Sequence, residues 1–208
     1  MLKQIIFLAL SACLFSSCAS SFKSITPNSF NYSNQSNSDE VLFSYKYDIL
    51  NERGNKKYFK KEAKKGIKVV AVKIVNNSNE TLTVGQNLKL YSGNNEVNIL
   101  QPSFVHSQLR QHTELHILYL LLTPVKLYTS NSNGDTNTYS IGYGLGPGLT
   151  ALNMGIAAGA NSNFKNELEQ YFLNGKSIQP GETVYGIVGL VDSGYNPLSI
   201  KKTSNNIL

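Results

Sequence analysis

The sequence predicts a mainly β protein with a helical insertion (α+β): an immunoglobulin-like antiparallel β-sandwich, with helices inserted at about residues 103–175. Three observations support this. Short strand patterns fill the chain up to residue 100 and return after residue 183. The stretch between them changes to a helical period. Turns rich in Asn, Ser, Gly and Pro separate the strand patterns, as is typical of sandwiches.

The strands before the insertion are predicted from alternation and β-branching. Residues 41–50 alternate apolar and polar side chains, which indicates a half-buried strand. Residues 67–75 are β-branched and almost continuously apolar, which indicates a central strand. Shorter strands are expected at 82–84, 88–91 and 97–100.

The insertion begins with a predicted helix over 103–122, which ends before Pro124. A hairpin follows, with arms 125–129 and 136–143 around Asn133-Gly134-Asp135. Residues 141–160 form a Gly-rich apolar stretch. A second helix is capped by Asn161 or Ser162 and stops at Asn174-Gly175, and final strands are predicted at 184–191 and 198–201.

The N-terminus predicts a cleaved lipoprotein signal over 1–17. A lysine start, a short apolar run and Ser16-Ser17 precede Cys18, and this resembles the lipobox of bacterial lipoproteins, although Phe15 stands where Leu is commoner. We expect Cys18 to carry the lipid, so that the protein is anchored to a membrane. Cys13 lies in the discarded part, which leaves no mature thiol for a disulfide, a metal or catalysis. The alternatives are an ordinary secretory signal or an N-terminal anchor helix.

The remaining chain is divided by composition. Residues 18–40 are rich in Ser and Asn and predict a flexible tether, or alternatively surface turns of the domain. Residues 41–202 predict a single sandwich domain and 203–208 a tail. Charged residues make up 15%, below the roughly 25% of soluble domains, which favours an extracytoplasmic β-rich protein over a cytosolic enzyme. The net charge of +6 favours anionic partners.

Seven basic residues form the main charge cluster and the candidate anion-binding patch. They are Arg53, Lys56, Lys57, Lys60, Lys61, Lys64 and Lys65. If residues 56–61 form an edge strand, the lysines protect that edge from pairing with another chain. The functional alternative is contact with anionic headgroups or glycans. We expect no nucleic-acid partner for an extracytoplasmic protein.

No catalytic residue, metal site or cofactor is predicted. His112 and His116 have the spacing of a zinc-protease helix, but Thr113 stands where that motif needs Glu. The glycines from Gly142 to Gly148 fit neither a dinucleotide nor a phosphate loop.

The stretch 141–160 also contains paired small residues four apart and lacks charge, so membrane insertion through it is one alternative. The other is a soluble loop and short helix that seals the sandwich edge with apolar side chains. Those side chains are Leu149, Leu152, Met154 and Ile156.

Residues 72–78 end a hydrophobic strand in an Asn/Ser turn, and 179–183 place a Pro-Gly-Glu turn before a late strand. These phrases resemble sandwich modules in uncharacterised envelope lipoproteins of the Bacteroidota type, over roughly residues 40–202. The resemblance implies a fold and a location, with no activity to carry over.

The function expected is that of a non-enzymatic envelope lipoprotein which binds a protein or glycan partner. Ala19 and the residues after it carry no acid, which favours the outer membrane and its periplasm-facing leaflet. The alternatives are a glycan-acting or other hydrolytic enzyme and a membrane-inserting assembly.

Overall fold

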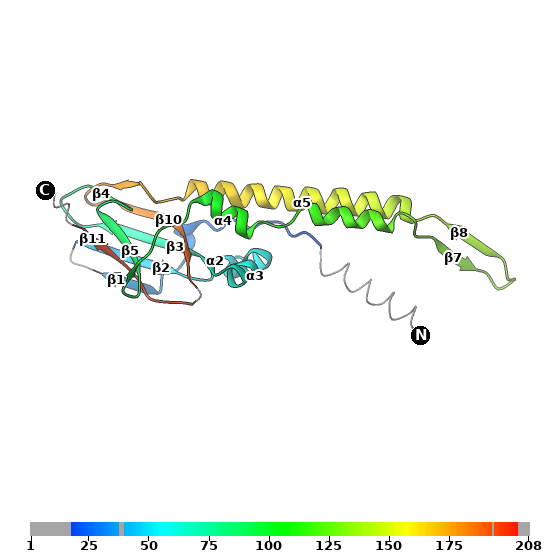
Figure 1. The fold of residues 1–208 in the computed structure, drawn as a ribbon, viewed down its shortest axis with the longest axis horizontal. Helices are drawn as coiled ribbons and strands as arrows, with labels where there is room; N and C mark the ends of the chain where they lie inside the picture. Colours follow the sequence, from blue (N-terminus) through cyan, green and yellow to red (C-terminus); the bar gives the residue numbers. More distant parts are fainter. Residues whose placement is uncertain (1–17, 38–39, 193, 204–208) are drawn as a thin grey trace. The chain divides into compact units, whose positions relative to one another are not determined.

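The computed structural model describes residues 18–37, 40–192 and 194–203 (Figure 1). The described residues form two compact units. Unit 1 comprises residues 18–21 and 111–161, and unit 2 comprises 22–110 and 162–203.

Unit 2 holds most of the strands. They are β1 (Asn34–Asn37), β2 (Val41–Lys46), β3 (Ile67–Asn76), β4 (Leu82–Thr83), β5 (Leu88–Ser92), β6 (Asn95–Glu96), β9 (Ser177–Ile178), β10 (Thr183–Val191) and β11 (Leu198–Lys202). Its helices are η1 (Pro27–Ser29), α2 (Ile49–Glu52), α3 (Lys56–Lys65) and α4 (Pro102–Leu109), with α5 (Gly142–Gln170) from residue 162 onward. The α+β class predicted from the sequence is therefore confirmed, although the described chain is not mainly β, because helices contribute as much of it as strands do.

The sheets of unit 2 are antiparallel. The larger has the order β1-β2-β3-β10, and a second has the order β11-β5-β6. The central position predicted for residues 67–75 is confirmed, because β3 pairs with β2 on one side and with β10 on the other. Its apolar run follows from that position, because residues 71–75 pair with both neighbouring strands and eight of the ten residues of β3 are buried.

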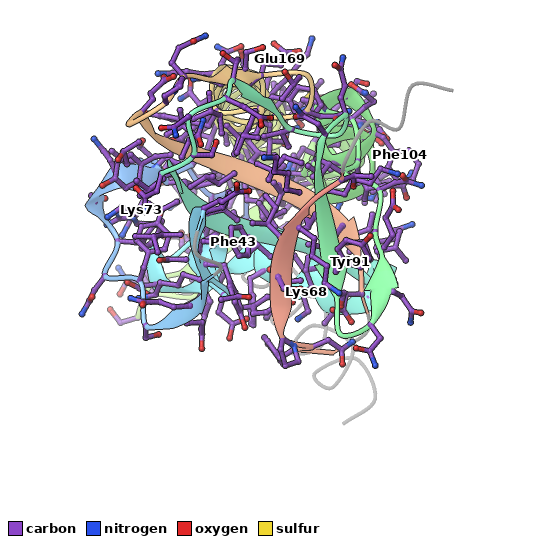
Figure 2. All side chains as sticks on the ribbon, turned by 90° about the vertical axis from the view of Figure 1, so that its left-hand side faces the viewer. Phe43, Lys68, Lys73, Tyr91, Phe104 and Glu169 are labelled. Carbon is purple, nitrogen blue, oxygen red and sulfur yellow. The ribbon has the colours of Figure 1, made fainter. Side chains whose placement is uncertain are left out.

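One core cluster joins side chains of both sheets, including Phe43 of β2, Leu90 of β5 and Ile200 of β11. Figure 2 shows these strands with their side chains. A second cluster joins the other face of β3 to helical residues, including Tyr58 of α3 and Phe164 of α5. Successive side chains of β3 alternate between the two clusters, as the period of a strand requires.

Two predicted turns lie where the sequence places them. β3 ends at Asn76, whose buried amide Nδ2 donates to the carbonyl oxygens of Glu80 and Ile178, while Oδ1 accepts from Ser78. Gly181 has a φ of 75°, which glycine adopts without steric cost. The turn thus precedes β10 as predicted.

Unit 1 consists of η2 (Glu114–Leu122), the hairpin β7 (Leu127–Ser130) and β8 (Thr136–Tyr139), and α5 up to residue 161. The predicted hairpin is confirmed, although its strands are shorter, and Gly134 in its turn has a φ of 87°.

Two helix predictions differ from the structure. The helix expected over 103–122 is divided into α4 and the 3-10 helix η2, because Arg110 is extended and the Gln111 N–H donates to the Asn161 side chain. The stretch 141–160 is helical and continuous with the helix predicted after it, so that α5 runs from 142 to 170. The local cost of glycine in a helix is offset here by packing within unit 1.

The strand predictions also need correction at several places. Residues 56–61 belong to α3, whose Tyr58 and Glu62 are four apart and share its buried face. The strand expected over 41–50 ends at Lys46. Residues 97–100 contribute only a single bridge from Leu100 to Gly189.

Residues 18–37, the described part of the segment predicted as a tether, are packed on the folded chain. Ile25 and Phe30 are buried in the second core of unit 2. Glu167 holds the segment, because its carboxylate accepts hydrogen bonds from the backbone N–H groups of Ile25 and Thr26 at 2.8 Å. The polar composition of the segment concealed these two apolar anchors.

Candidate interaction surface

Unit 1 exposes large apolar side chains on both of its helices. Those of η2 are Leu115, Ile117, Leu118, Leu120 and Leu121. Those of α5 are Leu145, Leu152, Met154 and Ile156. We call these nine side chains the apolar surface; on α5, Leu145, Leu152 and Ile156 share one face of the helix, whereas Met154 lies on another. Leu121 is 74% exposed and Leu152 is 60% exposed. Soluble monomers rarely leave large contiguous apolar areas in water, and where they do, the area is commonly an interaction site.

Charge is nearly absent around the apolar surface. Between residues 111 and 161 the sequence has three charged side chains, Glu114, Lys126 and Asp135. From 136 to 164 it has none. Recognition here would therefore rely on burial of apolar area rather than on ion pairs. The alternative that Leu152, Met154 and Ile156 seal a sandwich edge is wrong, because all three are exposed.

Two glycines of α5 allow the helix to lie close to η2 and the turn after it. A Cβ on Gly142 would stand 2.2 Å from the carbonyl oxygen of Leu122, and one on Gly146 would stand 2.6 Å from Oγ1 of Thr123. By contrast, a Cβ on Gly144 would meet no atom within 4 Å, and the same holds at Gly148, Gly155 and Gly159. The glycines thus serve two faces, one against η2 and one outward.

The N-terminal segment of unit 1 is attached to α5 and to Gln111, which precedes η2. The Ala19 N–H donates to Oδ1 of Asn153 at 2.7 Å. The Ser20 N–H donates to Oε1 of Gln111 at 3.1 Å, and Nε2 of Gln111 donates back to the Ser20 carbonyl at 2.6 Å. Cys18 is exposed. The residue predicted to carry a lipid therefore lies one residue away from a hydrogen bond to α5.

Buried amides maintain this arrangement. Gln111, Asn153 and Asn161 are each buried. The Gln111 backbone N–H donates to Oδ1 of Asn161 at 2.7 Å, and Nδ2 of Asn161 donates to the Gln111 carbonyl at 2.8 Å. Sequence patterns did not single out Gln111 or Asn153, and Asn161, predicted as a helix cap, lies inside α5 and pairs with Gln111 instead. The feature that could have predicted their burial is that these amides lie within an uncharged, largely apolar stretch.

The candidate anion-binding patch lies in unit 2, largely on α3. Lys56, Lys60 and Lys64 are exposed and four residues apart, so one face of the helix presents them together. Lys65 is also exposed. The reading of this patch as protection of a strand edge fails, because residues 56–65 are helical.

The other members of the patch take part in packing. The Arg53 guanidinium lies 4.3 Å from the centre of the Phe30 ring, and its Nε donates to the Ile25 carbonyl. Lys61 donates to the carbonyl oxygen of Arg110. Lys57 is half-buried. These contacts leave the exposed lysines of α3 as the part of the patch open to an anion.

Glu62 is a buried carboxyl group on the inner face of α3, with 1% of its surface exposed. Its Oε1 accepts the Val69 N–H at 2.6 Å, and Oε2 has no hydrogen-bond partner. The pKa of Glu62 is raised to about 8, chiefly by burial and to a small extent by Asp48, although the Val69 N–H and Lys68 act in the opposite direction. Its hydrogen-bond donor is the backbone N–H of Val69 in β3, so we assign Glu62 a role in packing and no role in chemistry.

The two histidines four residues apart do not form a site. His112 is exposed and pairs with Glu114 at 3.0 Å, whereas His116 is buried and stacks on the Tyr119 ring. Across the described ranges, no three His, Cys, Asp or Glu side chains are placed to hold a metal ion. A depression of about 130 Å³ beside β5 is lined by polar groups, including the ion pair of Lys89 and Glu96. It is smaller than the roughly 300–1,000 Å³ of ligand pockets.

No helix in the part of the chain that the structure describes is both long enough and apolar enough to cross a membrane. No protein-family model, no curated protein sequence and no solved structure matches the chain.

Proposed function

We propose that this chain is a non-enzymatic lipoprotein of the cell envelope, anchored by a lipid on Cys18, which acts by binding a protein or glycan partner. The position of Cys18 is the observation that carries the proposal. It is exposed, and the residue after it is hydrogen-bonded to Asn153 of α5. A lipid there would enter a membrane while the chain behind it stays attached to the fold.

In this proposal unit 2 is an immunoglobulin-like sandwich of the type found in Bacteroidota envelope lipoproteins, and it presents the partner-binding surface. Its shared core between the sheet β1-β2-β3-β10 and the sheet β11-β5-β6 supports a sandwich. The exposed lysines of α3 are the candidate contact for acidic glycans or anionic headgroups. The absence of acid after Cys18 supports placement in the periplasm-facing leaflet of the outer membrane.

The test is metabolic labelling of cells with an alkyne analogue of palmitate. We expect the wild-type chain to be labelled and to run at the size of the cleaved protein. The Cys18→Ser variant should carry no label and should stay at the larger size of the uncleaved chain. Cys13→Ser is the matched control, because Cys13 lies in the part expected to be removed, and it should be labelled like the wild type. Label that persists in Cys18→Ser, or a Cys18→Ser chain that keeps the size of the wild-type mature protein, contradicts the proposal.

A second candidate function is membrane insertion through residues 141–160. The exposure of Leu145, Leu152 and Ile156 in a stretch without charge favours it.

A further inference from the structure

We infer that the apolar surface of unit 1 contacts the lipid bilayer, with its side chains among the acyl chains of the membrane that holds the Cys18 anchor. This inference rests on the proposed function for the position of the anchor. It adds a second attachment, made by the folded protein itself.

The anchor and the apolar surface are far apart in the sequence but are brought together within unit 1 by a hydrogen bond. Ala19 follows Cys18 directly, and its N–H donates to Asn153 Oδ1 at 2.7 Å. Asn153 lies between Leu152 and Met154, which are both exposed. Because one residue spans about 3.8 Å, acyl chains on Cys18 would enter the bilayer close to this part of α5. A lipid on Cys18 would therefore keep the middle of α5 close to the membrane, because no long flexible linker separates the two.

The chemistry of α5 in unit 1 suits an apolar medium. Hydrocarbon offers no hydrogen-bond partners, so polar groups that enter it must be paired within the protein. Thr150 Oγ1 donates to the Gly146 carbonyl at 2.9 Å, and Asn153 Nδ2 donates to the Leu149 carbonyl at 2.9 Å. Both polar side chains thus bond to their own helix one turn earlier, and no charge occurs from 136 to 164.

The contact inferred here is interfacial rather than spanning. Residues 142–161 of α5 extend about 30 Å at 1.5 Å per residue. No described helix has the composition of a membrane span. Apolar side chains of a helix that lies in the plane of the membrane enter the boundary between headgroups and acyl chains, and their burial there provides the affinity.

The competing occupant is a second copy of the chain. The outward glycines of α5, such as Gly148 and Gly155, would permit close approach of another helix. The bilayer is the favoured occupant because the proposed anchor places the membrane beside Asn153. A membrane would also bury the exposed apolar side chains of η2.

The experiment uses the chain that the proposed cleavage leaves, residues 18–208, with Cys18→Ser so that no lipid is attached. Flotation with phosphatidylcholine vesicles, which carry no net charge, measures membrane binding. We expect the protein to float with the vesicles and the binding to persist at about 1 M salt, where exposed charges are screened. Leu121→Glu and Leu152→Glu should each lower the partition by about tenfold or more.

Val191→Glu is the matched control. Val191 is 67% exposed and lies at the end of β10 in unit 2, so its replacement should leave flotation unchanged. Circular dichroism verifies that each variant is folded.

Three results would overturn the inference. The first is no flotation, or flotation that neither leucine variant reduces. The second is binding only to anionic vesicles with loss in salt, which would assign it to the lysines of α3. The third is a soluble oligomer that Leu121→Glu disperses, without flotation, which would identify a second copy as the occupant. If Cys18 is not labelled in cells but flotation occurs, the proposed anchoring fails and the membrane contact stands.

Discussion

Glu62 should make the stability of this protein fall as the pH rises from about 5 to about 7. Its pKa is 4.5 as an ordinary glutamate and about 8 in the folded chain, chiefly because burial disfavours the ionised form. Between these values the folded chain retains the proton and the unfolded chain releases it. The folded state therefore binds more protons, so the free energy of unfolding decreases with increasing pH.

The size of the effect follows from the two pKa values. The stabilisation is fully present below the unfolded pKa of 4.5 and is lost as the pH rises through the folded pKa of about 8. Each pH unit well inside this window removes about 1.4 kcal/mol. Between about pH 5 and about pH 7 we expect a loss of about 2–3 kcal/mol from this group, a large part of the stability of a small domain.

The perturbation is Glu62→Gln, which keeps the shape and the acceptor for the Val69 N–H but cannot ionise. Both the amide and the protonated carboxyl place a donor where Oε2 lies, so the two proteins should have similar stability at about pH 5. At about pH 7 the variant should be more stable by about 2–3 kcal/mol.

The assay is urea unfolding followed by circular dichroism at both pH values, for wild type and variant. Subtracting the free energy of unfolding of the variant from that of the wild type at each pH removes the contribution of every other titrating group. Glu169→Gln is the control, since its side chain is half-exposed and forms a surface ion pair with Lys165. A wild-type minus variant difference that stays constant between the two pH values would refute the account of a protonated buried carboxyl.

Two further predictions concern the helix α5. Gly142→Ala should destabilise the protein by about 1–3 kcal/mol, because the new Cβ would stand 2.2 Å from the Leu122 carbonyl oxygen. Gly144→Ala, with no atom within 4 Å, should raise stability by up to about 1 kcal/mol, and equal changes in the two thermal unfolding midpoints would contradict this. Glu167→Gln should cost about 2–4 kcal/mol and speed cleavage of residues 22–30 by protease, because an amide NH2 would replace Oε2, which accepts the Ile25 N–H at 2.8 Å. Protease sensitivity no greater than that of Glu169→Gln would argue against this role.

Much of the sheet could be predicted because its signals are local. β3 and β10 are continuous β-branched or apolar runs bounded by turn residues, and the turns at Asn76 and Gly181 are encoded by the residues within them. The fold class was therefore accessible at the level of α+β.

The helices were harder to predict because packing competes with local preference there. The lysine-rich residues 56–61 alternate in a way that also suits a strand, and only the burial of Tyr58 and Glu62 on one face of α3 distinguishes the helix. The glycines of 141–160 oppose a helix locally. They are accommodated because Gly142 and Gly146 allow α5 to approach η2 more closely than any side chain would permit.

The sequence by itself determined the central strand β3, the turns that bound it, the expectation of a lipid on Cys18 and the absence of charge from 136 to 164. These features depend on neighbouring residues alone. Only the tertiary structure decided that the segment after Cys18 is attached to Gln111 and Asn153, and that the apolar side chains of η2 and α5 face outward. The physical reason is that a hydrophobic pattern states how much apolar surface a chain carries, whereas contacts between distant residues decide which part of that surface remains exposed.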